Sequence, residues 1–147
     1  MKKKNYFKLY MMELMGLMCL ASILLPWISY GVGSKTGLDI GRISVQTILI
    51  SGVLFLFFSY LNYKIEKIEK FTLYVVLLLA TLLLGVFVLE IIRIGYQSSI
   101  TKNLPVEMFG VASLATTKIH IGYGLWLGGA AAFMMFLVNF ISLKIFK

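Results

Sequence analysis

The chain has little of the chemistry that enzymes and metalloproteins use. Its 147 residues include one cysteine, one histidine, two prolines and six acidic residues. A single cysteine, Cys19, excludes an intrachain disulfide and the redox chemistry that depends on one. One histidine beside so few carboxylates supplies too few ligands for a metal site, and no catalytic motif is present. We therefore expect no enzymatic activity, no cofactor and no bound metal.

Apolar side chains, in contrast, dominate the sequence. Hydrophobic residues make up 60% of it, charged residues make up 14%, and the mean hydropathy is +0.92. The apolar residues gather in four stretches, at residues 9–30, 43–63, 71–92 and 119–143. Each has about the ~20 residues that a helix needs to cross ~30 Å of hydrocarbon. The sequence predicts an all-α membrane protein with four transmembrane helices in a single domain.

The connections between these stretches predict how the helices are arranged. The first outer loop, 31–42, and the inner loop, 64–70, are short enough to make their flanking helices antiparallel neighbours. An up-down-up-down bundle follows. In the longer second outer loop, 93–118, Pro105 suits the first turn of a helix and Glu107 its positive end, so we expect a short interfacial helix there.

Positive charge and aromatic residues indicate the orientation. Nine of the 14 Lys and Arg residues fall on the side of the two termini and five on the side of the outer loops. The positive-inside rule then places both termini in the cytoplasm. Aromatic residues border the predicted spans, and those expected at the outer membrane surface are Trp27, Tyr30, Tyr96, Tyr123 and Trp126. The net charge of +8 is spread over helix ends, so we expect no nucleic-acid partner.

Small residues mark two places where backbones approach closely. The first outer loop carries four glycines around Asp39, a pattern that suits tight turns and a short hairpin lying on the bundle. A ligand-cradling loop is the alternative. In the fourth stretch Gly124, Gly128 and Ala132 form a small-xxx-small stripe beside Trp126. That stripe either packs within this chain or forms a face for a second membrane protein.

Ionisable residues at membrane depth are costly and are common at functional sites. Glu13 lies near the inner end of the first stretch. Glu90 lies near the outer end of the third, with Arg93 at the i, i+3 spacing of an ion pair. The structural interpretation is that these residues meet water or each other at the two membrane surfaces. The functional interpretation is that Glu90, Arg93 and His120 converge beneath the second outer loop and bind an anion, an amine or a lipid headgroup.

The functional hypothesis that agrees with this inventory is binding without catalysis. We expect an accessory subunit of a membrane complex, or an immunity-type protein against a membrane-active toxin, in a bacterial plasma membrane. The expected partners are membrane lipids and either another membrane protein or a second copy of the chain. The alternative is a small proton-coupled transporter that uses Glu13 or Glu90.

Overall fold

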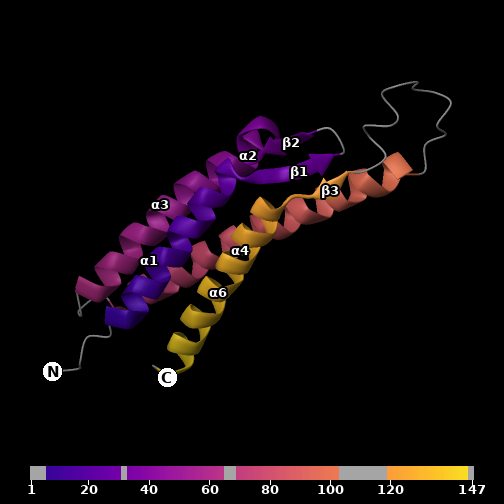
Figure 1. Ribbon diagram of the computed structural model, residues 1–147. Helices are drawn as coiled ribbons and strands as arrows, with labels where there is room; N and C mark the ends of the chain where they lie inside the picture. Colours follow the sequence, from indigo (N-terminus) through magenta and orange to yellow (C-terminus); the bar gives the residue numbers. More distant parts are fainter. Residues whose placement is uncertain (1–5, 31–32, 65–68, 103–118, 146–147) are drawn as a thin grey trace.

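Four long helices make up most of the computed structural model, which describes residues 6–30, 33–64, 69–102 and 119–145 (Figure 1). These helices are α1 (Tyr6–Ala21), α3 (Arg42–Lys64), α4 (Glu69–Lys102) and α6 (Tyr123–Ile145). Each provides an apolar segment long enough to cross a membrane, with the turn after α1 included in the first. The prediction of four such helices is confirmed.

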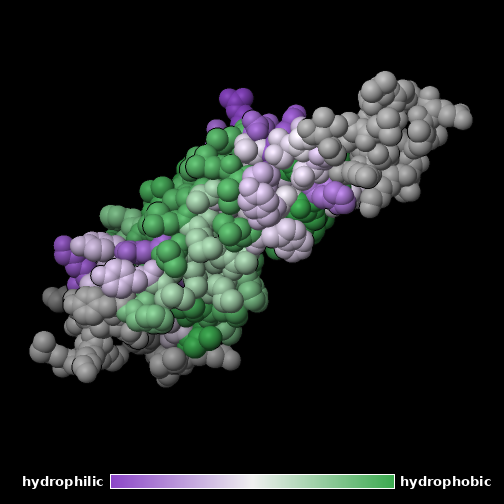
Figure 2. Space-filling model, viewed as in Figure 1, coloured by the Kyte–Doolittle hydropathy of each residue, from purple (hydrophilic) through white to green (hydrophobic). Residues whose placement is uncertain are grey.

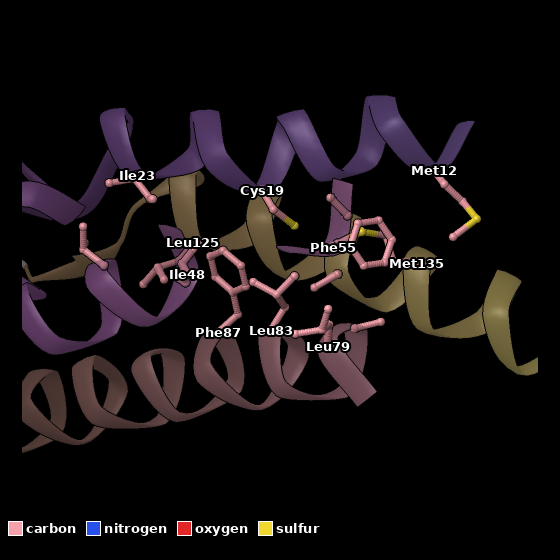
Figure 3. Packing of buried hydrophobic residues seen from close by; sticks show 14 of the residues in the cluster. Met12, Cys19, Ile23, Ile48, Phe55, Leu79, Leu83, Phe87, Leu125 and Met135 are labelled. Carbon is pink, nitrogen blue, oxygen red and sulfur yellow. The ribbon is translucent and has the colours of Figure 1, made fainter. Parts of the chain in front are cut away.

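The four helices surround one core. The first helix, α1, packs on α3 and α6, and α4 packs on the same two helices. In Figure 1, α1 and α4 run toward one end of the bundle, while α3 and α6 run back to the other. Buried side chains from all four helices point into the space between them (Figure 3), among them Cys19, Ile48, Phe55, Leu83, Phe87 and Met135.

A small β-sheet at one end of the bundle contradicts the all-α prediction. Its strands are β1 (Pro26–Tyr30), β2 (Gly33–Thr36) and β3 (His120–Ile121), in the order β2-β1-β3. Both neighbouring pairs are antiparallel. A hairpin was expected within residues 31–42, but the observed hairpin begins earlier, since β1 lies in residues predicted to belong to the first span. The distant strand β3 extends it. We call this sheet, together with the short helix α2 (Gly37–Ile40), the cap.

The first apolar stretch is helical over a shorter length than predicted. We expected a helix up to Tyr30, but α1 ends at Ala21 and a single 3₁₀ turn, η1 (Ser22–Leu24), leads into β1. Pro26 explains the break, because proline has no N–H to donate and disfavours a helical residue before it. Leu25 is accordingly extended, with φ −89° and ψ 158°. The apolar residues from Pro26 onward lie in the sheet.

The third stretch is helical over a greater length than predicted. We placed the end of its helix at residue 92, whereas α4 continues to Lys102. An apolar composition indicates only which residues can lie in the hydrocarbon of the membrane. The helix itself can extend beyond the hydrocarbon until a helix-terminating residue ends it. The fourth helix begins at Tyr123, later than the predicted 119, because β3 precedes it. The interfacial helix predicted around Pro105 and Glu107 lies outside the described residues.

Trp27 joins the cap to the bundle, and its expected place at the membrane surface is wrong. Its side chain is completely buried, and its Nε1 donates a hydrogen bond of 2.9 Å to the Ser22 carbonyl. The indole meets the Phe87 ring edge-on, with centroids 6.3 Å apart. A Cβ on Gly37 or Gly41 would lie 2.6 or 2.7 Å from the indole, so both glycines are needed for α2 to lie against it.

The molecular surface differs between the middle of the bundle and its two ends. Hydrophobic residues cover the middle of the face in Figure 2, and hydrophilic residues lie toward the cap and toward the opposite end. Large apolar side chains are exposed along all four long helices, for example Leu14, Ile50, Leu78 and Phe133. An exposed apolar surface of this extent suits hydrocarbon on the outside of the bundle.

Asp39 provides a pH-dependent contact within the cap. Its carboxylate accepts hydrogen bonds from the Thr36 backbone N–H at 2.9 Å and from the Thr36 hydroxyl at 2.8 Å. These two bonds, in that order, lower the pKa of the Asp39 carboxyl below its ordinary value of 3.8, and the charge of Lys35 adds to the effect. The contact is thus complete above that value and is lost as the pH falls through the lowered pKa.

We predict that the amide signal of Thr36 moves with an acid titration whose midpoint lies below pH 3.8. Two-dimensional NMR of the protein in detergent micelles measures this midpoint. The Asp39→Asn variant keeps an acceptor but cannot ionise, so its Thr36 signal stays constant over the same range. A midpoint above 3.8 would contradict the assigned hydrogen bonds.

Candidate functional site

Glu90 is the buried carboxylate of the described bundle, and it lies where α4 meets the first turn of α3. The residue is 4% exposed. Its Oε1 accepts a hydrogen bond from the Ser44 hydroxyl on α3. Its Oε2 lies 3.3 Å from Nε of Arg93, one turn further along α4. That contact lacks hydrogen-bond geometry, since Oε2 is buried without a hydrogen-bond partner. The charge of Arg93 therefore balances a carboxylate that is only partly hydrogen-bonded.

Arg93 extends this contact to the cap. Its Nη2 donates to the carbonyl of Ile40, the last residue of α2, at 3.3 Å. The side chain remains 46% exposed. We call Glu90, Arg93, Ser44 and the Ile40 carbonyl the Glu90 cluster. It connects α4 to α3 and to the cap, on the turn of α4 that follows Phe87.

The cluster has a limited chemical repertoire. A carboxylate already occupied by a hydroxyl and a guanidinium can accept further donors, but among the described residues no second carboxylate contacts this cluster to form an acid–base pair. The carboxylate of Asp39 binds Thr36 in the cap. Within the described residues there is no group of three metal-ligating side chains. The geometry thus suits a structural ion pair or a binding role.

The other ionisable candidates lie apart from this cluster. Glu13 is half-buried in the middle of α1. His120 is exposed on β3, in register with Ser29 of β1. Among the described residues, no hydrogen bond or ion pair joins His120 to Glu90 or Arg93. The structure brings Glu90 and Arg93 together as expected and leaves His120 on the sheet.

The small-residue stripe of α6 lies against this chain's own helices and cap. A Cβ on Gly128 would lie 2.3 Å from Phe87 Cε1 and 2.6 Å from Ser22 Oγ. A Cβ on Gly124 would lie 2.8 Å from the Leu25 Cβ. Ala132 is completely buried. Of the two interpretations of the stripe, packing within the chain is the one that these contacts show.

Trp126 lies apart from the stripe's contacts and is exposed. Its exposed fraction is 58%, and Tyr96 and Tyr123 are also exposed. These three aromatic residues keep the exposure expected of a membrane-surface belt, unlike Trp27.

Two polar features of the bundle were missed by the sequence analysis. Ser44 lies two residues after the start of α3, and a hydroxyl at the second position of an apolar stretch was the available signal. Asn139 is completely buried on α6, where its Nδ2 donates to the Met135 carbonyl at 2.8 Å and its Oδ1 has no hydrogen-bond partner. A lone asparagine in an apolar span was the signal for that residue.

No family model, curated protein or solved structure matches this chain. Its function is therefore argued from the chain's own residues.

We predict that Gly128→Ala lowers the free energy of unfolding by about 1–3 kcal/mol, because the added methyl overlaps Phe87 and forces α4 and α6 apart. Thermal melting in detergent, followed by circular dichroism, measures the loss. Gly129→Ala is the matched control, since its Cβ would lie 3.8 Å from Ile91 Cδ1, an ordinary contact. Equal melting temperatures for the two variants would show that the stripe is not packed as described.

We also predict that Arg93→Gln destabilises the protein more than Glu90→Gln does. Arg93→Gln leaves the buried Glu90 carboxylate without its counterion, and we expect a loss of about 2 kcal/mol of unfolding free energy after allowing for the exposure of Arg93. Glu90→Gln replaces the carboxylate with a neutral amide, and we expect a loss of about 1 kcal/mol of unfolding free energy. Unfolding by increasing SDS in mixed micelles measures the free energy of unfolding of each variant. The double variant Glu90→Gln/Arg93→Gln is expected to recover part of the loss, and strict additivity would argue against a coupled pair.

Proposed function

We propose that this chain is a non-catalytic integral membrane protein that binds a second membrane protein through its cap. The observation that supports this most directly is the way Trp27 holds the cap to the bundle. A loop tied down by a buried indole, a sheet and the Glu90 cluster loses little conformational entropy when a partner binds it. Such preorganisation favours recognition of a protein surface.

The proposed orientation places the cap outside the cell, both termini in the cytoplasm and the bundle in a bacterial plasma membrane. The distribution of Lys and Arg supports it, with nine on the side of the termini and five on the side of the cap. The cap then faces the compartment from which a toxin arrives, and it also faces the outer parts of larger membrane complexes.

Two roles fit this arrangement, an accessory subunit and an immunity-type protein. They differ in what the chain needs in order to be stable. An accessory subunit depends on its partner for stability or correct placement, whereas an immunity protein folds alone and binds only when a toxin or toxin–receptor complex is present. The abundance of the chain in cells with and without the partner separates the two.

Proton-coupled transport is the second candidate, and one observation favours it. Glu90 has a buried carboxylate oxygen without a hydrogen-bond donor, and buried carboxylates at membrane depth are common in the pathways of transporters. Its contacts with Ser44 and Arg93 argue for a fixed structural role instead.

Leu38 provides the sharpest test of the cap as the binding surface. It belongs to α2, and its side chain is 57% exposed. If a partner covers it, Leu38→Glu removes an apolar contact worth about 1.5–3 kcal/mol and weakens binding about tenfold or more. The tagged full-length chain is recovered from its native membrane in mild detergent, and stoichiometric companions are measured by quantitative mass spectrometry.

Lys35→Gln is the matched control, because Lys35 is also an exposed cap residue and its change leaves α2 intact. The proposal expects a companion that Leu38→Glu loses and Lys35→Gln keeps. Companions that bind Leu38→Glu as well as the parent chain would contradict the cap as the binding surface. A chain recovered without companions would contradict the accessory-subunit role and leave the immunity-type role, with transport as the second candidate. The substrate flux of the Glu90→Gln variant would then test the transport hypothesis.

A further inference from the structure

Arg93 presents part of its guanidinium to the outside of the bundle in a defined orientation. Nε faces Glu90 at 3.3 Å, and Nη2 donates to the Ile40 carbonyl at 3.3 Å. Nη1 donates to no residue that the structure describes. Because the guanidinium is planar, these two contacts on one side direct the remaining N–H groups outward.

The neighbours of Arg93 on α4 are exposed apolar and aromatic residues. Leu89 and Tyr96 lie four residues before and three after it, which places all three on one helical face. Leu89 is 67% exposed, Ile92 is 61% exposed and Tyr96 is 68% exposed. A leucine on one side and a tyrosine on the other are typical of the border between hydrocarbon and headgroups.

The charges around this position leave an excess of positive charge. Arg42 and Lys35 are exposed residues near the two ends of α2, and with Arg93 they give three cations. Asp39 and Glu90 give two anions, one bound to Thr36 and the other buried behind Arg93. An anion that approaches Arg93 from the outside therefore meets the guanidinium before it meets the buried Glu90 carboxylate.

We propose that Arg93 binds the phosphate of an anionic phospholipid headgroup, with the lipid chains lying against Leu89 and Ile92. A guanidinium recognises phosphate oxygens with two parallel hydrogen bonds, which a lysine cannot reproduce. Glu90 and the Ile40 carbonyl are the positioning groups. This inference requires the bundle to lie in a membrane, and it does not depend on any protein partner.

The test places a tryptophan beside the proposed site. In the variant Tyr96→Trp/Trp126→Phe, the reporter replaces an exposed residue one turn from Arg93, and the buried Trp27 contributes a background that lipid does not reach. The full chain is reconstituted in phosphatidylcholine vesicles that contain a minor fraction of brominated phosphatidylglycerol. Matched vesicles carry the same fraction of brominated phosphatidylcholine. Bromine quenches tryptophan on contact, so excess quenching by the first lipid measures its enrichment at the site.

We expect enrichment of the anionic lipid by about fivefold, the factor for one arginine at an anionic membrane surface, and its loss in Arg93→Gln. Glu90→Gln/Arg93→Gln loses it too, without leaving a buried charge unpaired. The same substitutions in the Trp126→Phe chain, in which Trp27 is the one tryptophan, show by unchanged emission that the cap remains folded in each variant. Arg42→Gln is the matched control, because it removes the same charge but not the oriented guanidinium.

Three results would overturn the proposal. One is equal quenching by the two brominated lipids in the parent chain. Another is an equal loss of enrichment in Arg42→Gln and Arg93→Gln, which would show a diffuse charge effect. The third is abolition of the enrichment by inorganic phosphate at concentrations comparable to the lipid, which would identify free phosphate as the ligand. Retained enrichment in the absence of any partner protein separates this inference from the proposed function.

Discussion

The burial of Trp27 is the contact on which the arrangement of the cap depends. The indole fills the space between η1, α2 and Phe87 of α4, and its N–H is satisfied by the Ser22 carbonyl. Burying a tryptophan with its donor paired is one of the larger single contributions that a side chain makes to packing. Gly37 and Gly41 admit the ring, and the Trp27 carbonyl accepts a hydrogen bond of 2.8 Å from Gly122 N, just before α6. Two nearby segments, η1 and α2, and two distant ones, at Phe87 and Gly122, therefore meet around one residue.

Hydrophobicity explains why the helices could be predicted and the cap could not. A chain in hydrocarbon must pair its backbone within each segment, so apolar length alone predicts α3, and predicts α4 up to the point where it leaves the membrane. Pro26 was visible in the sequence, but the apolar residues Trp27 to Tyr30 had the composition of a span. Their pairing with β2 is local, whereas their pairing with β3 joins residues about ninety positions apart. That contact is tertiary, and periodicity in a single segment carries no signal for it.

The candidate site could likewise be predicted only in part. The Glu90–Arg93 pair follows from helical spacing, since residues three apart lie on neighbouring turns. Ser44 and the Ile40 carbonyl come from other helices, so their part in the cluster depends on how α3 and α2 pack. The membership of His120 was inferred from loop proximity, and the sheet register places it beside Ser29 instead. Local geometry was predictable, and the arrangement across helices was not.

The interior of the bundle is occupied by the chain's own contacts, and this constrains where function can lie. Gly124 and Gly128 bring α6 against η1, β1 and α4, and Phe87 fills the space between the cap and the core. Glu90 is engaged by Ser44 and Arg93. Interactions with other molecules are then left to the surfaces, namely the cap, the outward edge of Arg93 and the exposed apolar faces. This packing supports the proposed recognition of partners and lipids at the surface over the transport of a substrate through the centre.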